Sequence, residues 1–296
     1  MKRKAIYIIM VSLLAAAAVS CTREIQVPDG EEATLTVTAS LDAAMDDGTK
    51  ASADGGLTNL AAQGGYSLRY NMELWSEDGK TLEYSADTIL KKLSPESEDY
   101  SVQYSLNLLA KKYKMVLWAD IVDIDGNAAY NVSNGLTAIR FPEESAFVSD
   151  EYDAFTAVAD VDLIDGSKVI GAILKRPFAK IRVIDMTESD PGTEYTTKLT
   201  FDNPVSIPVE YNALAGDVTS ATDGITGTPT CTSTSEDGTR LCLFTGYIFV
   251  PKDQQSTKYS FTIVVSDENN TSVANVPVYD VTVRRNALTT VKEEIL

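Results

Sequence analysis

Three cysteines are the side chains of this 296-residue chain with the clearest capacity for covalent chemistry, and the chain contains no histidine. A cysteine thiol can be acylated, oxidised to a disulfide or used as a nucleophile, depending on its surroundings. The absence of histidine removes Ser-His-Asp triads, histidine-ligated zinc and the most common general base. Cys21, Cys231 and Cys242 are therefore the candidate reactive residues, and any chemistry that they carry needs no imidazole.

Cys21 ends an N-terminal segment that is built like an export signal. A basic head at residues 2–4 precedes an apolar run at 5–19, and small residues lead into the cysteine. The run has the length of a signal-peptide core and is short for a bilayer-spanning helix. The final Ala-Val-Ser-Cys resembles the bacterial lipobox, in which the thiol is acylated, for example with palmitate, and becomes the first mature residue. We expect a signal peptide at 1–20 and a lipidated tether at 21–32. The alternative is a plain secretory signal with its cysteine there by chance.

Cys231 and Cys242 are placed symmetrically about an acidic turn sequence. If residues 235–238 form a four-residue turn, the two cysteines face each other across a hairpin. Opposed residues have Cβ atoms roughly 4.5–5.5 Å apart, whereas a disulfide needs about 3.5–4.5 Å, a gap that a non-hydrogen-bonded pair could close. We expect either one disulfide that staples the hairpin or two buried thiols, and no redox role, because CxxC spacing is absent.

The carboxylates form no recognisable catalytic or metal-binding pattern. The Asp-rich segments 123–127 and 160–166 look calcium-like, but neither carries the D-x-D-x-D-G loop with a bidentate Glu at position 12. Solvated turns between strands are therefore favoured. No nucleophile-elbow, P-loop or dinucleotide-binding motif occurs. With 43 acidic residues, close carboxylate pairs arise by chance and predict no glycosidase. We expect no enzyme, no catalytic residues, no metal and no cofactor.

The composition predicts a folded and strongly acidic exported protein. Hydrophobic residues make up 44% of the chain, which supports a sizeable core. Without the basic head, 22 Lys and Arg stand against 43 Asp and Glu. Such a surface repels both nucleic-acid phosphates and anionic lipid headgroups. The charge thus argues against nucleic-acid binding, and membrane contact must come from a lipid anchor.

Alternating apolar segments indicate an all-β protein. In residues 33–41, Leu35, Val37 and Ala39 fall on one face and hydroxyl side chains on the other, as in a half-buried strand. Residues 42–65, rich in Asp, Gly, Ala and Ser, are expected to form a long loop. Further strands are predicted at 66–75, 81–87, 100–109, 113–122, 168–186, 194–201, 205–212, 243–251, 259–266 and 273–283.

The strand pattern predicts β-sandwich architecture. The turn-forming residues Ser189-Asp190-Pro191-Gly192 indicate the best domain boundary. We therefore predict an N-terminal domain at 33–188 and a C-terminal domain at 189–296. Trp75 and Trp118 lie in strand-like runs, which favours core packing over an exposed sugar-stacking platform.

Several stretches, taken in order, resemble the fimbrillin-like lipoproteins of Bacteroidales. The resemblance covers nearly the whole mature chain. It is carried by Ala18-Val19-Ser20-Cys21, by TLTVTASL near the first predicted strand, by YKMVLWADIVD followed by DGNAAYNVS, by EYDAFTA, by LKRPFAKIRV and by VPVYDVTVRRNALTTV.

The resemblance implies two tandem transthyretin-like β-sandwiches that build, cap or anchor surface fimbriae. Assembly in that family is by strand exchange, in which a donor strand completes a neighbour's open groove. Shaft subunits are cut near the end of the first strand, and the matching processing site here is Lys50, where the family often has arginine. The C-terminal VKEEIL departs from the family's usual glycine-containing ending.

Two hypotheses of function follow. The first is a structural protein: a fimbrial or pilus subunit or anchor, held on the outer membrane by lipid on Cys21, joined to other fimbrillin-like subunits and serving adhesion to host or bacterial surface glycans or proteins. The alternative is a binding module: a surface glycan-binding lipoprotein accessory to an outer-membrane importer. An open groove or removable edge strand favours the first, and exposed aromatics in one concave patch favour the second.

Overall fold

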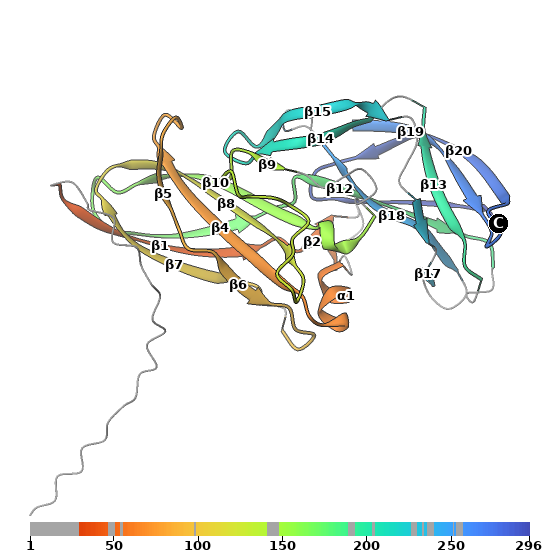
Figure 1. Ribbon diagram of the computed structural model, residues 1–296, viewed down its shortest axis with the longest axis horizontal. Coiled ribbons are helices and arrows are strands. Elements are labelled where there is room, and N and C mark those ends of the chain that lie inside the picture. Colours follow the sequence, from red (N-terminus) through yellow and green to blue (C-terminus); the bar gives the residue numbers. More distant parts are fainter. Residues whose placement is uncertain are drawn as a thin grey trace, which may run out of the picture.

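The chain folds into two layered β-structures placed end to end (Figure 1). The all-β class predicted from the sequence is thereby confirmed. The computed structural model describes residues 30–46, 51–53, 56–97, 99–140, 148–188, 193–202, 205–225, 230–232, 234–235, 240–250, 252 and 257–296.

The N-terminal sandwich pairs a three-stranded sheet, in the order β11-β1-β7, with a five-stranded sheet, in the order β10-β8-β4-β5, where β6 also pairs with β4. The strands span β1 Glu32–Leu41, β4 Ser67–Ser76, β5 Leu82–Ser85, β6 Ile89–Lys92, β7 Val102–Leu109, β8 Lys112–Val122, β10 Ala154–Asp162 and β11 Lys168–Leu174.

One continuous apolar core lies between these two sheets. Alternate residues of each strand enter it, because successive side chains of a strand point to opposite faces. On β1 these are Leu35, Val37 and Ala39, each with no solvent exposure, as the alternation predicted. The facing sheet contributes buried side chains from β4 and β8, among them Leu68, Tyr70, Met72, Met115 and Leu117.

The segment 42–65 is more ordered than a loop. It contains a short strand pair, β2 Ala44–Asp46 with β3 Ala51–Ala53, and the helix α1 Gly56–Gln63. Leu57 and Leu60 of α1 are buried in the core of the N-terminal sandwich. The loop prediction was wrong here, because a single eight-residue amphipathic helix carries too few turns to show a clear period. Among the described residues, no helix is long and apolar enough to cross a bilayer.

The C-terminal sandwich has two four-stranded sheets, in the orders β17-β18-β12-β21 and β16-β13-β19-β20. A further three-stranded sheet, β15-β14-β9, adjoins it. The strands span β9 Ile139–Arg140, β12 Phe178–Asp185, β13 Thr196–Phe201, β14 Val205–Asn212, β15 Asp217–Ile225, β16 Thr230–Thr232, β17 Thr234–Ser235, β18 Leu241–Phe249, β19 Thr257–Ser266, β20 Ser272–Val283 and β21 Leu288–Glu293.

Both sandwiches use the same pairing of first and last strands. In the N-terminal sandwich β1 pairs in parallel with β11, and in the C-terminal sandwich β12 pairs in parallel with β21. Each first strand is also paired antiparallel on its other side, β1 with β7 and β12 with β18. The two first strands differ in one respect: β12 continues directly from β11, whereas β1 is the first strand within the described residues.

The predicted run 168–186 is divided into β11 and β12 at the segment around Pro177, where proline cannot donate to a ladder. By strand pairing β12 joins β18 and β21 rather than the N-terminal sheets. The boundary sequence 189–192 lies outside the described residues. The division into 33–188 and 189–296 stays a prediction.

An aromatic cluster joins the two sandwiches. Trp118 of β8 is fully buried and lies 5.3 Å, centroid to centroid, from Tyr130 and 5.8 Å from Tyr211 of β14. Tyr130 in turn stacks on Phe178 of β12 at 6.2 Å. Burial raises the pKa of the Tyr130 hydroxyl well above its ordinary value. This core draws on both sandwiches and fixes one against the other.

Candidate functional site

The groove that β1 fills is the feature of the fold best suited to a functional role. We define the β1 groove as the space between β7 and β11, floored by β4 and β8. β1 pairs with β7 over eight residues, from Glu32 to Ala39, and with β11 over seven, from Leu35 to Leu41. The strand is therefore central in its sheet, although it is the first strand of the chain described.

Two kinds of interaction hold β1 in its groove. Its ladders satisfy backbone groups on both sides, and its inward side chains fill apolar pockets. Burying Leu35 and Val37 stabilises the fold by about 1.5–3 kcal/mol each. Near its N-terminal end, the Thr34 amide donates to Ser167 Oγ at 2.9 Å and the Thr34 hydroxyl donates to Asn107 Oδ1 at 2.9 Å. If β1 left, both neighbouring strands would expose unpaired edges.

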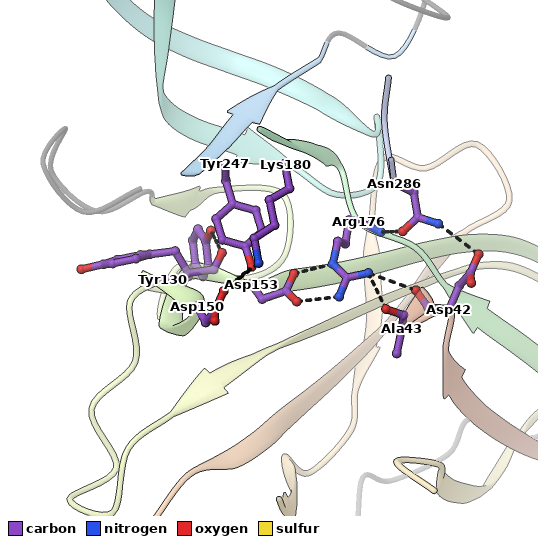
Figure 2. A network of polar contacts seen from close by, with 10 residues as sticks. Asp42, Ala43, Tyr130, Asp150, Asp153, Arg176, Lys180, Tyr247 and Asn286 are labelled. Atoms are coloured by element: carbon purple, nitrogen blue, oxygen red, sulfur yellow. Dashed lines mark hydrogen bonds and ion pairs between the residues drawn. The ribbon is translucent and has the colours of Figure 1, made fainter. Parts of the chain in front are cut away.

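Arg176 holds the C-terminal end of β1. Its guanidinium lies in the link between β11 and β12 and is 1% exposed. Nη1 donates to the carbonyl of Ala43 at 3.0 Å and to that of Asp42 at 3.4 Å (Figure 2). Nε and Nη2 both donate, at 2.7 Å, to the two carboxylate oxygens of Asp153, which is fully buried. The guanidinium also lies over the Phe155 ring, 4.4 Å from its centroid.

Asn286 adds a contact from the far end of the sequence. It lies in the turn between β20 and β21, and its Nδ2 donates to Asp42 Oδ2 at 3.0 Å. Its Oδ1 accepts from the Arg176 amide at 3.3 Å. The Asp42 amide donates to the Leu174 carbonyl at 2.8 Å. The end of β1 is thus tied to both sandwiches at once. We call Asp42, Asp153, Arg176 and Asn286 the latch.

A second ion pair, partly buried, lies beside the latch. Lys180 Nζ of β12 donates to Asp150 Oδ1 at 2.8 Å, and the Tyr247 hydroxyl of β18 donates to the same oxygen at 3.3 Å. Figure 2 shows this group next to the latch, with Tyr130 alongside. Asp150 belongs to a short 3-10 turn, Asp150–Tyr152, that packs against α1. Desolvation offsets much of the attraction in a pair withdrawn from water, so this pair is weak evidence of added stability.

Of the four residues predicted from cysteine chemistry and processing, the structure describes the two that lie in the C-terminal sandwich. Cys21 and Lys50 lie outside the described residues. Cys242 of β18 is buried, and its thiol donates to the Phe244 carbonyl at 3.5 Å. Its hairpin partner is Thr234 and not Cys231, which pairs with Thr197 in a different sheet. The two cysteines are therefore not opposed across the hairpin. Their disulfide stays a prediction.

The calcium-like turn has a structural explanation. Asp123 Oδ1 accepts from the amides of Asp125 and Asn127 at 2.9 and 2.7 Å, and Oδ2 accepts from Asn127 Nδ2 at 2.9 Å. The Asn127 side chain, with these amides, lowers the pKa of the Asp123 carboxyl. The carboxylate thus closes a turn between strands. No cluster of three or more candidate metal ligands occurs within the described part of the chain.

Sequence reasoning did not identify the latch, although its residues lie in segments that the resemblance quoted. LKRPFAKIRV contains Arg176, and RRNALTTV contains Asn286. An arginine directly before a proline, in a strand-like run rich in apolar residues, was the available signal. Its partner Asp153 lies 23 residues earlier and could not be selected among 43 acidic residues.

Comparison with known proteins assigns the chain to one family, and that family has no described activity. A model described as "Family of unknown function (DUF6562)" matches residues 26–296. No curated protein matches the chain.

Solved structures similar to the chain include two fimbrial proteins. The tip fimbrial protein Mfa3 from Porphyromonas gingivalis, with a C-terminal truncation, is 11% identical over 88% of this chain and 94% of its own, with a TM-score of 0.49. A fimbrial assembly protein from Parabacteroides distasonis is 11% identical over 88% of this chain and 92% of its own, with a TM-score of 0.42. Both are fimbrial proteins, the kind of protein that the sequence resembles. At these scores the likeness assigns no function.

Proposed function

We propose that this chain, which belongs to the DUF6562 family of unknown function, is a lipid-anchored cell-surface protein of fimbrial or adhesive type. In this proposal it is not an enzyme, and it assembles with like subunits through the β1 groove. The observation that carries the proposal is the position of β1, which is central in its sheet although it is the first strand described. A strand in that position can be withdrawn and replaced without unthreading any other strand.

The contrast with β12 supports this proposal. β12 occupies the equivalent place in the C-terminal sandwich, but it is joined to β11 at one end and leads on to β13 at the other. It cannot leave its sheet without unfolding both sandwiches. β1 needs only one break in the chain after Leu41, and Lys50 lies in the following segment. A strand offered by another subunit would then find two ladders and a set of apolar pockets, which is the physical basis of strand addition.

Attachment to the outer membrane is proposed to depend on lipid at Cys21. Replacing Cys21 with alanine should abolish incorporation of labelled palmitate and shift the protein from the membrane to the soluble fraction. Two acyl chains are needed for stable anchoring, so the loss should be nearly complete. Cys242→Ala is the matched control and should keep both label and membrane location. Persistence of the label in the Cys21 variant would overturn the anchor.

Release of β1 can be tested on the full chain. Residues 47–50 are replaced by the recognition sequence of a site-specific protease, and the purified protein is cut there. A labelled peptide of residues 32–41 is then added in excess. We expect the cut protein to exchange its own β1 for the peptide and the uncut protein to exclude it, because the covalent strand has a high effective concentration.

Two outcomes decide this test. Uptake by the cut protein alone supports strand exchange at the groove. No uptake after complete cutting, with the N-terminal fragment retained, would mean that β1 is a permanent part of the sandwich. A peptide with the same residues in reversed order serves as control, since it cannot present Leu35, Val37 and Ala39 to the pockets in the native direction.

The glycan-binding alternative gains no support from the tryptophans. Trp118 is fully buried in the cluster between the sandwiches, so it cannot stack on a sugar. Trp75 is half-buried, and its indole N–H donates to Glu73 Oε2 at 3.0 Å. The position of Trp118 agrees with the core packing that its strand-like surroundings predicted.

A further inference from the structure

A pocket at the C-terminal end of β1 has a charge balance opposite to that of the chain. Its volume is about 460 Å³, and it opens beside the latch, between residues of both sandwiches (Figure 2). Acidic residues outnumber basic ones by 43 to 25 in the sequence, but the described residues that line this pocket include three bases and one acid. The acid belongs to the end of β1. We define the junction pocket as the space bounded by Asp42, Lys175, Arg176, Arg285 and Asn286.

Two of the three bases are already paired within the chain. Arg176 is paired with Asp153, and Arg285 Nη2 lies 3.9 Å from Asp217 Oδ1. Lys175 differs, because the one carboxylate within 4 Å of its Nζ, among the residues that the structure describes, is the one at the end of β1. If β1 left its sheet together with that carboxylate, the junction pocket would keep one unbalanced positive charge.

Asn286 has a backbone conformation that indicates a role for its side chain. Its φ is +54°, in the left-handed region where glycine fits at the lowest cost. Asparagine adds a side chain whose Nδ2 donates to the Asp42 carboxylate at 3.0 Å and whose Oδ1 accepts from the Arg176 amide at 3.3 Å. A hydrogen bond to a charged acceptor is roughly twice as strong as one between neutral groups. The Asn286 amide therefore suits a carboxylate better than an uncharged acceptor.

We propose that the junction pocket is a carboxylate-binding site, filled by Asp42 before assembly and by an Asp or Glu of the incoming strand after it. This inference rests on the strand exchange proposed above, because a break near Lys50 releases Asp42 together with β1. It adds a requirement that the apolar pockets do not impose. The incoming strand must carry an acidic side chain directly after the residue that replaces Leu41. The partner is thus a strand of alternating apolar residues with an acidic end, running in the direction of β1.

The main-chain contacts of the latch cannot supply this selectivity. Arg176 Nη1 donates to the carbonyls of residues 42 and 43, and every strand presents such carbonyls. The side chain at position 42 is what distinguishes an acidic strand from a neutral one, and Asn286 and Lys175 are the groups that contact it. The Asp42 side chain is 33% exposed, so water screens part of its attraction to Lys175. The expected selectivity is therefore modest.

Peptides added to the cut protein test the requirement while the body of the protein stays wild type. The native peptide covers residues 32–43 and has an acetylated N-terminus and an amidated C-terminus, so its carboxylates are those of Glu32 and Asp42. Asp42→Asn keeps the size of the side chain and removes its charge, and it should weaken binding about fivefold. Glu32→Gln is the matched control. It removes an equal charge from an exposed side chain at the start of β1 and should bind like the native peptide.

Fluorescence anisotropy of the labelled peptides gives their Kd values at low and at high salt. The preference for Asp42 over its Asn variant should shrink in about 1 M salt, where the screening length is about 3 Å. A body that carries Asn286→Gly with Lys175→Ala lacks both contacting groups, and glycine tolerates the φ of Asn286. On this body the two peptides should bind within about twofold of each other, because the interaction that couples them is gone.

The outcomes separate this inference from the strand exchange on which it rests. Equal binding of the native and Asp42→Asn peptides to the wild-type body would overturn the carboxylate-binding site and leave strand exchange intact. A preference that persists on the doubly substituted body would also overturn the site. Binding of neither peptide, after complete cutting and loss of the N-terminal fragment, would overturn strand exchange and the site together.

Discussion

Replacing Arg176 with alanine is expected to lower the free energy of unfolding by about 3–5 kcal/mol, because it leaves the Asp153 carboxylate in the interior without its guanidinium. Asp153 is fully buried, and both of its oxygens accept from Arg176 at 2.7 Å. The variant also loses the donors to the carbonyls of Asp42 and Ala43. Chemical denaturation followed by tryptophan fluorescence measures the change, since Trp118 lies in the adjoining core.

Lys175→Ala is the matched control for this prediction. Lys175 is the neighbouring cation, its side chain is 64% exposed, and its Nζ lies 3.9 Å from Asp42 Oδ2. Exposed pairs of this kind contribute about 0–1 kcal/mol. If the two variants lose equal stability, the burial of the latch is not what makes Arg176 important.

A double variant separates stability from the hold on β1. Replacing Arg176 with methionine and Asp153 with leucine removes both charges and should recover much of the lost stability. The hydrogen bonds from Arg176 to the end of β1 remain absent. Bonds to a charged donor contribute about 1.5–3 kcal/mol, so strand release after cutting should be roughly ten- to hundredfold faster than in the wild type. Unchanged release would mean that Arg176 stabilises the fold without retaining β1.

The fold could be predicted from the sequence where local pattern decides it. The alternation of Leu35, Val37 and Ala39 predicted the strand, and it also predicted which face of the strand is buried. It could not tell that this strand is central, because pairing with β7 and β11 joins residues about 70 and 135 positions away. Apolar content alone was misleading on β11, where Val169 and Ile173 face outward.

The candidate site was predictable only in outline. The resemblance directed attention to the first strand and to the segments that contain Arg176 and Asn286. It did not show that they meet, because the contacts run between Asp42 and Asn286, 244 residues apart. Buried ion pairs leave no periodic signal, so their partners emerge only once the topology is fixed.

Val37→Asp is expected to have the largest effect of any single substitution in β1, because Val37 has no solvent exposure and lies between Tyr104 of β7 and Ile170 of β11. An unpaired carboxylate at that position costs several kcal/mol. Thr38→Asp adds the same charge one residue later, on the exposed side of the same strand, and should change stability by less than about 1 kcal/mol. The difference in stability between the two variants shows which face of β1 stabilises the strand in its sheet.

The same pair of substitutions tests assembly when it is placed in the exchanging strand and not in the body of the protein. A 32–41 peptide carrying Val37→Asp should bind the cut protein at least about a hundredfold more weakly than the native peptide, since each 1.4 kcal/mol is a factor of ten. The Thr38→Asp peptide should bind almost normally. In cells, the full-length Val37→Asp chain should give no heat-resistant ladders and no surface polymers by electron microscopy, while Thr38→Asp keeps both. Because the peptide arm leaves the body of the protein wild type, equal binding by the two peptides would reject the β1 groove as the assembly site, whatever the fate of the full-length variant.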